Sequence, residues 1–79
     1  MNDLKHQEIT QQDLDLYFFY RYHGIREAFF KRYFNFLAKS RTNIEAFNSA
    51  NDEHFILFGD YRYSTYNSFG INLKKYLNQ

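Results

Sequence analysis

Basic and aromatic side chains are the residues in this chain whose types and spacing could do chemistry. A cluster of cations, Arg26 to Arg41, is followed by three tyrosines that flank or lie near Arg62. Cations neutralise phosphates and exposed rings stack on bases, so this combination suits single-stranded nucleic acid. Tyr and Arg are also enriched where proteins bind each other. The residues that we predict to contact a partner are Lys31, Arg32, Lys39, Tyr61, Arg62, Tyr63 and Tyr66.

Side chains that could catalyse a reaction or hold a metal lack the necessary spacing. The histidines at 6, 23 and 54 do not show the i, i+4 or short-loop spacing of a metal site. The chain has no cysteine, and no Ser or Thr stands in a nucleophile elbow or triad setting. The three glycines are isolated and form no phosphate-binding loop. We therefore expect a protein that is not an enzyme and binds no metal or cofactor.

The core that must position these side chains has to come from aromatic residues. Half of residues 17–36 are aromatic, and a chain of 79 residues without disulfides depends on burial for its stability. Each buried aromatic side chain removes about 150–250 Å² from water. Residues 1–9 show no hydrophobic periodicity. We predict a flexible N-terminal arm over 1–9 and a single compact domain over 10–79.

The first helix is predicted over residues 11–23. Thr10 has the hydroxyl of an N-cap, and acids at 13 and 15 suit the positive end of a helix. The helix is apolar on nearly every side, which is typical of a helix that is central to the fold or part of an interface. Gly24 either ends this helix as a C-cap or lies within a longer one, and we favour a tightly broken helix pair.

Two further helices are indicated after Gly24. Residues 25–40 have an aromatic face opposite a basic ridge that contains Lys31 and Lys39. The pattern Thr42-x-x-Glu45 is a capping box, which predicts a short helix over 42–50. Residues 51–54 are polar and are predicted to form a loop.

The last third of the chain favours strands. The apolar run 55–58, the Gly59-Asp60 pair and the Tyr-rich segment 61–66 have the form of a β-hairpin. A third strand near 69–73 and a final helix over 71–77 remain alternatives. The predicted fold class is α+β, with two or three aromatic-rich N-terminal helices followed by a short antiparallel hairpin or meander. The alternative is a small all-α bundle in which Asn51 begins a fourth helix that Gly59 ends.

Charge and composition narrow the functions to consider. Acidic residues dominate 1–20 and 45–60, basic residues dominate 21–44 and 61–79, and the total is only +1. Nucleic-acid-binding proteins usually carry a larger basic excess. No apolar run approaches the roughly 20 residues of a membrane span, and the polar start is unlike a signal peptide. We expect a cytoplasmic protein that does not enter membranes.

No motif in the chain identifies a family. Our first hypothesis is a small non-catalytic protein that binds another protein or protein complex. The chain lacks Pro, Cys, Trp and Val and is rich in residues with AT-rich codons. This composition suits a phage- or plasmid-encoded inhibitor of a host defence or nucleic-acid-processing complex, like an anti-CRISPR or anti-restriction protein. The alternatives are a nucleic-acid-binding regulator that uses the basic helix and stacking tyrosines, and a subunit that self-associates as a homodimer through the first helix.

Overall fold

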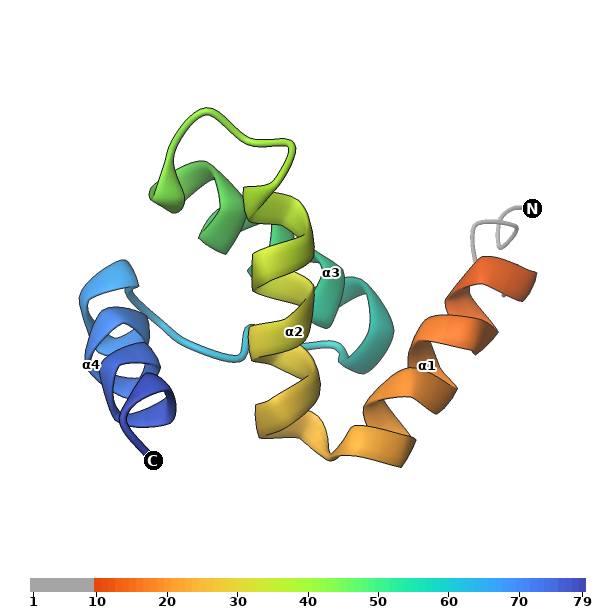
Figure 1. The fold of residues 1–79 in the computed structure, drawn as a ribbon. Coiled ribbons are helices and arrows are strands. Elements are labelled where there is room, and N and C mark those ends of the chain that lie inside the picture. Colours follow the sequence, from red (N-terminus) through yellow and green to blue (C-terminus); the bar gives the residue numbers. More distant parts are fainter. Residues whose placement is uncertain (1–9) are drawn as a thin grey trace.

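The computed structural model describes residues 10–79, which form four helices and contain no strand (Figure 1). Helix α1 spans Gln11–His23, α2 spans Ile25–Leu37, α3 spans Asn43–Phe58 and α4 spans Tyr66–Leu77. The predicted α+β class is therefore wrong, and the alternative, a small all-α bundle, describes the fold. Gly59 ends a helix as that alternative predicted, but Asn51 lies inside α3 and does not begin a further helix. The predicted arm at 1–9 lies outside the described residues.

The predicted hairpin is instead the end of α3 followed by a loop. A run of four apolar residues cannot be assigned to strand or helix by periodicity alone, and 55–58 continues α3. Gly59 adopts the left-handed conformation, with φ 85° and ψ 4°, and its N–H donates to the carbonyl of Phe55 at 2.7 Å. Gly59 is thus a helix C-cap and not a hairpin turn. The predicted loop at 51–54 lies inside α3, and residues 69–73 lie inside α4.

The helix starts that were predicted from capping residues are confirmed. Thr10 and Thr42 accept hydrogen bonds from the backbone N–H groups of Asp13 and Glu45, at 3.0 and 3.1 Å. Thr65 caps α4 in the same way. Gly24 breaks the chain into α1 and α2, as favoured, with φ 88° and ψ 150°, and its N–H donates to the carbonyl of Tyr20. Helix α2 ends at Leu37, three residues earlier than predicted.

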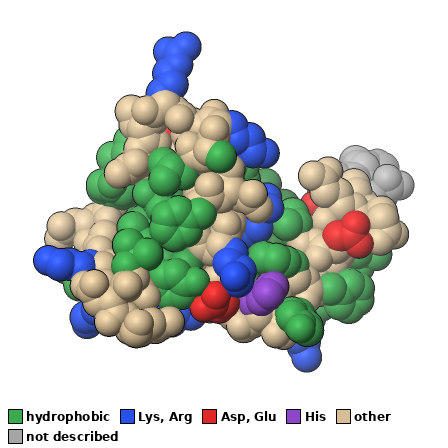
Figure 2. All heavy atoms as spheres, in the orientation of Figure 1, with side chains coloured by type: hydrophobic (Ala, Val, Ile, Leu, Met, Phe, Trp, Pro, Cys, Tyr) green, Lys and Arg blue, Asp and Glu red, His purple; other side chains and the backbone are tan. Residues whose placement is uncertain are grey.

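The described part of the chain is elongated, with extents of 46 × 25 × 22 Å. Helix α2 packs against α3 and α1 packs against α2, so α1 lies at one end of the molecule (Figure 1). Hydrophobic side chains gather on the surface over α2 and α4, and again over α1 (Figure 2). No helix within residues 10–79 has both the length and the apolar character that a membrane crossing needs.

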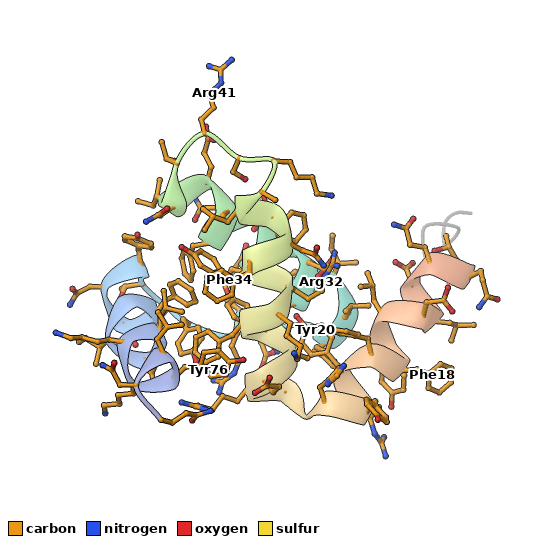
Figure 3. The ribbon with its side chains drawn as sticks, in the orientation of Figure 1. Phe18, Tyr20, Arg32, Phe34, Arg41 and Tyr76 are labelled. Atoms are coloured by element: carbon orange, nitrogen blue, oxygen red, sulfur yellow. The ribbon has the colours of Figure 1, made fainter. Side chains whose placement is uncertain are left out.

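The core is built around aromatic rings from all four helices. Buried rings come from each helix and from the loop before α4, and small buried residues of α2 and α3 allow these two helices to approach closely. Tyr20 points from α1 toward α2, and Tyr76 from α4 does the same (Figure 3). The buried core residues are Tyr20, Ala28, Phe29, Phe30, Tyr33, Ala46, Phe47, Ala50, Tyr63 and Phe69.

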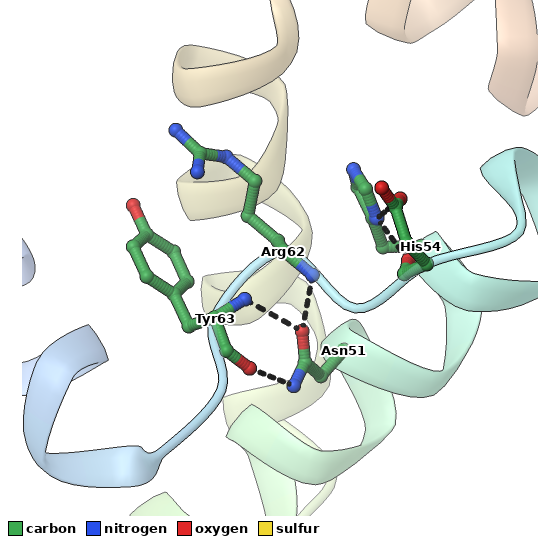
Figure 4. Close-up of polar contacts among 5 residues, drawn as sticks. Asn51, His54, Arg62 and Tyr63 are labelled. Carbon is green, nitrogen blue, oxygen red and sulfur yellow. Dashed lines mark hydrogen bonds and ion pairs between the residues drawn. The ribbon is translucent and has the colours of Figure 1, made fainter.

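A buried polar clamp fixes the loop that precedes α4 (Figure 4). The amide oxygen of Asn51 accepts from the backbone N–H groups of Arg62 and Tyr63, at 2.8 and 3.3 Å. Its amide nitrogen donates to the carbonyl of Tyr63 at 2.8 Å. One turn further along α3, Nδ1 of His54 donates to the carbonyl of Asp60 at 2.7 Å. Asn51 and His54 therefore replace the strand pairing that the sequence suggested for this segment.

Candidate binding surfaces

The structure places the predicted partner-binding cations Lys31 and Arg32 of α2, and Lys39 just beyond its end, in different settings. Nζ of Lys31 lies 3.4 Å from a carboxylate oxygen of Glu27, one turn earlier. The Arg32 guanidinium donates two hydrogen bonds of 2.8 Å to Glu53 on α3, and these bonds raise the pKa of Arg32 above its usual value. Lys39 is exposed, with Nζ 5.6 Å from the centre of the Phe36 ring. Arg32 therefore joins α2 to α3 within the fold.

The four predicted residues in the segment 61–66 do not form the face of a strand. Tyr63 is buried in the core, and the guanidinium carbon of Arg62 lies 4.7 Å from the centre of the Tyr63 ring. Tyr61 is exposed and its ring packs against Phe55, with centroids 4.8 Å apart. Tyr66 begins α4 and is partly exposed. The seven predicted residues thus differ in exposure, and their role in partner binding stays a prediction.

A surface that the residue prediction missed runs along the outer side of α1. Leu14, Phe18 and Tyr22 follow one another at intervals of four residues and therefore share one face of the helix. Their exposed fractions are 37%, 60% and 85%. Phe18 points away from α2 (Figure 3). We refer to these three residues as the α1 stripe.

The opposite side of α1 holds the helix against the bundle. Tyr20 is 1% exposed, and its ring packs edge-on against Phe58 of α3 with centroids 5.2 Å apart. Burial raises the pKa of the Tyr20 hydroxyl above its usual value. Tyr17 also reaches the Phe58 ring, at 6.1 Å. The all-round apolar character of α1 was visible in the sequence, but only the packing shows which side is left exposed.

A second surface is a groove between α1 and α3. Its apolar part comes from both helices and from the end of α2, and carboxylates stand along it. Ile56 is 73% exposed there. We refer to this groove as the acidic groove. The lining residues used below are Asp13, Leu16, Phe36, Asp52, Ile56 and Leu57.

The two surfaces present exposed apolar side chains and carboxylates. Within residues 10–79, no three His, Asp or Glu side chains are grouped so that they could hold a metal ion. Comparisons of the chain with protein-family models, with curated proteins and with solved structures find no match. A function for this protein therefore has to be argued from its exposed side chains.

Proposed function

We propose that this protein acts by binding another protein through the α1 stripe. The observation that carries the proposal is the exposure of Phe18 and Tyr22, 60% and 85%, beside Leu14 on one face of a terminal helix. A helix that is apolar on every side is either central to a fold or part of an interface. Because α1 lies at the end of the bundle, its outer side is available to a partner.

Covering the stripe would contribute part of the free energy of binding to a partner. Fully burying one aromatic or aliphatic side chain contributes roughly 1.5–3 kcal/mol. A partner that covers Phe18 and Tyr22 therefore gains several kcal/mol before the cost of association. Aromatic residues at the centre of an interface are the usual hot spots, and Tyr adds a hydroxyl for a polar contact.

The charges around the stripe favour a protein over nucleic acid. Asp15 and Arg21 are both exposed on α1, so charged groups of both signs lie on the helix beside the stripe. A phosphate backbone would be repelled by Asp15, whereas a protein surface can match both groups. On α2, Lys31 and Arg32 are already close to Glu27 and Glu53. The nucleic-acid reading of the basic helix is thus the second candidate.

The more specific role rests on the sequence alone. We propose a cytoplasmic inhibitor of a host defence or nucleic-acid-processing complex because the chain is small, lacks catalytic motifs and is rich in residues with AT-rich codons, as a mobile element of an AT-rich genome would be. The mechanism would be occlusion, in which a rigid helical body covers a channel or locks one conformation of its target.

The test is affinity capture with matched variants. The tagged proteins are incubated with cell lysate, with and without nuclease, and compared by mass spectrometry. They are the wild type, Phe18→Ser/Tyr22→Ser, Ile71→Ser and Lys31→Glu/Lys39→Glu. We expect wild type and Ile71→Ser to retain a stoichiometric protein partner. Ile71→Ser is the control because it replaces an exposed apolar residue on a different helix, α4. The Phe18→Ser/Tyr22→Ser variant should lose it.

Three other outcomes would each assign binding to a different surface or a different kind of partner. Loss of the partner only with Lys31→Glu/Lys39→Glu would move the interface to the basic ridge of α2. Recovery that disappears with nuclease, together with binding that weakens steeply between about 50 and 200 mM salt, would favour nucleic acid. A concentration-dependent dimer in sedimentation that Phe18→Ser/Tyr22→Ser abolishes would make the stripe a homodimer interface.

A further inference from the structure

The acidic groove begins where α1 and α3 diverge. The two helices touch at one end, where the Tyr17 and Tyr20 rings lie 6.1 and 5.2 Å from the Phe58 ring. Toward the N-terminus of α1 the same pair of helices forms the groove between Asp13 and Asp52. The groove lies on the inner side of α1, so it is a different surface from the α1 stripe.

Apolar side chains form the floor of the groove. Leu16 from α1, Phe36 from α2 and Leu57 from α3 line it and are each half-buried. Ile56 stands on the α3 side with most of its surface in water. Along α3 the lining runs from Ser49 to Leu57, about 12 Å at a rise of about 1.5 Å per residue, which suits roughly two turns of another helix.

The charged residues between 10 and 79 that line the groove are acidic. Asp13, Asp52 and Glu53 contribute carboxylates, and no Lys or Arg of this described range is part of the lining. Arg32 neutralises Glu53 through two hydrogen bonds of 2.8 Å. Asp13 accepts from the Thr10 N–H at 3.3 Å as part of the α1 cap. Asp52 is exposed. Asp13 and Asp52 therefore give the groove a net negative charge on either side of its floor.

We propose that the acidic groove binds a basic amphipathic helix of a partner protein. An apolar floor between two helices is the receptor geometry of helix-in-groove recognition, where anchors one turn apart enter the groove. Leu-type anchors would pack on Leu16, Ile56 and Leu57. Lys or Arg residues beside the anchors would lie near Asp13 and Asp52, which fixes the register of the bound helix. This inference does not depend on the α1 stripe.

The test uses a defined probe. A fluorescein-labelled amphipathic helical peptide of Leu, Lys and Ala is titrated with the protein by fluorescence anisotropy, next to its counterpart with Glu in place of Lys. We expect binding of the Lys peptide only. Asp52→Lys/Ile56→Ser should weaken it about tenfold, since it reverses one exposed charge and removes one apolar contact.

Matched variants separate the groove from the rest of the surface. Asp60→Lys/Ile71→Ser makes the same chemical changes at exposed positions outside the groove and should leave affinity within about twofold. Amide shifts on peptide addition should centre on Ser49, Ile56 and Leu57. The proposal is overturned by equal loss in both double variants, by equal binding of the two peptides, or by no binding. It is also overturned if Phe18→Ser/Tyr22→Ser alone removes binding, which would assign the peptide to the stripe.

Discussion

Helices α1 and α2 have the same length, 13 residues, and almost the same aromatic content, yet they have opposite roles in the fold. Helix α2 buries Phe29, Phe30 and Tyr33 because it lies between α1 and α3 and also meets α4. Helix α1 buries only Tyr20 and leaves Phe18 exposed, because it has neighbours on one side. The number of aromatic residues in a helix therefore does not tell which of its rings are buried. Their burial depends on how many other helices pack against that helix.

The largest expected difference between the two regions is the effect of removing one ring. Phe29→Ala deletes a fully buried side chain and should lower the free energy of unfolding by about 3–5 kcal/mol, which is enough to unfold much of a domain of this size. Phe18→Ala should change it by no more than about 0.5 kcal/mol. Urea unfolding followed by circular dichroism measures both. Similar losses for the two variants would break the comparison.

The second prediction concerns the polar part of the core. Asn51→Ala leaves two backbone N–H groups and one carbonyl without their partner, and should cost about 2–4 kcal/mol. Asn51→Asp keeps both acceptor interactions, but it places a buried carboxylate oxygen against the carbonyl oxygen of Tyr63, so at neutral pH it should cost at least as much as Asn51→Ala. The same urea experiment ranks them. A cost below about 0.5 kcal/mol for Asn51→Ala would show that the loop before α4 is held by other contacts.

The third prediction addresses the junction between the two regions. An added Cβ at Gly24 would meet no atom within 4 Å, but φ 88° with ψ 150° is a conformation that L residues rarely adopt. Gly24→Ala should therefore lower stability by about 1–3 kcal/mol through backbone strain alone. Gly70→Ala, in open space within α4, is the matched control and should raise stability by about 0.5–1 kcal/mol. Equal effects would exclude strain at the junction.

The smallest expected effect is a dependence on pH at the contact between α2 and α4. The Tyr76 hydroxyl donates to Glu27 at 2.8 Å, which lowers the pKa of Glu27 and raises that of Tyr76. Because the pKa of Glu27 is lowered in the fold, Glu27 contributes stability at pH values above its ordinary pKa of 4.5, and this contribution is lost as the pH falls. Because the pKa of Tyr76 is raised, Tyr76 contributes stability at pH values below its ordinary pKa of 10.0, and this contribution is lost as the pH rises.

Tyr76→Phe should therefore differ from wild type most between these two values and least in acid. Urea midpoints measured across the pH range give the difference directly. Tyr61→Phe removes a hydroxyl at an exposed position outside this contact and serves as the control. A difference between Tyr76→Phe and wild type that is the same at pH 3 and pH 7 would mean that the hydroxyl acts without Glu27.

Much of the helical framework could be predicted from the sequence because its signals are local. Thr10, Thr42 and Gly24 fix helix ends through hydrogen bonds to residues at most four positions away. The end of α3 could not be assigned, because 55–58 is apolar in either state and Gly59 suits both a turn and a C-cap. The contact between Asn51 and Tyr63 joins two separate segments of the chain, so no local sequence pattern predicts it.

The candidate surfaces show the same division. The apolar excess of α1 was evident in its sequence, but the choice of Phe18 over Tyr20 as the exposed ring depends on where α2 and α3 pack. Arg32 was predicted to face a partner, whereas its fork geometry matches Glu53 across the bundle. A basic ridge on a helical wheel therefore does not say which cations remain available.

The order in which the helices pack has a consequence for the speed of folding. Neighbours in sequence are neighbours in space, since α1 packs on α2 and α2 on α3. Helical chains with such local contacts fold in microseconds to milliseconds. Helix α4 is different, because its Phe69 lies in the core and the loop that leads to it is held by Asn51 of α3. We therefore expect the first three helices to assemble through their local contacts and α4 to dock after them.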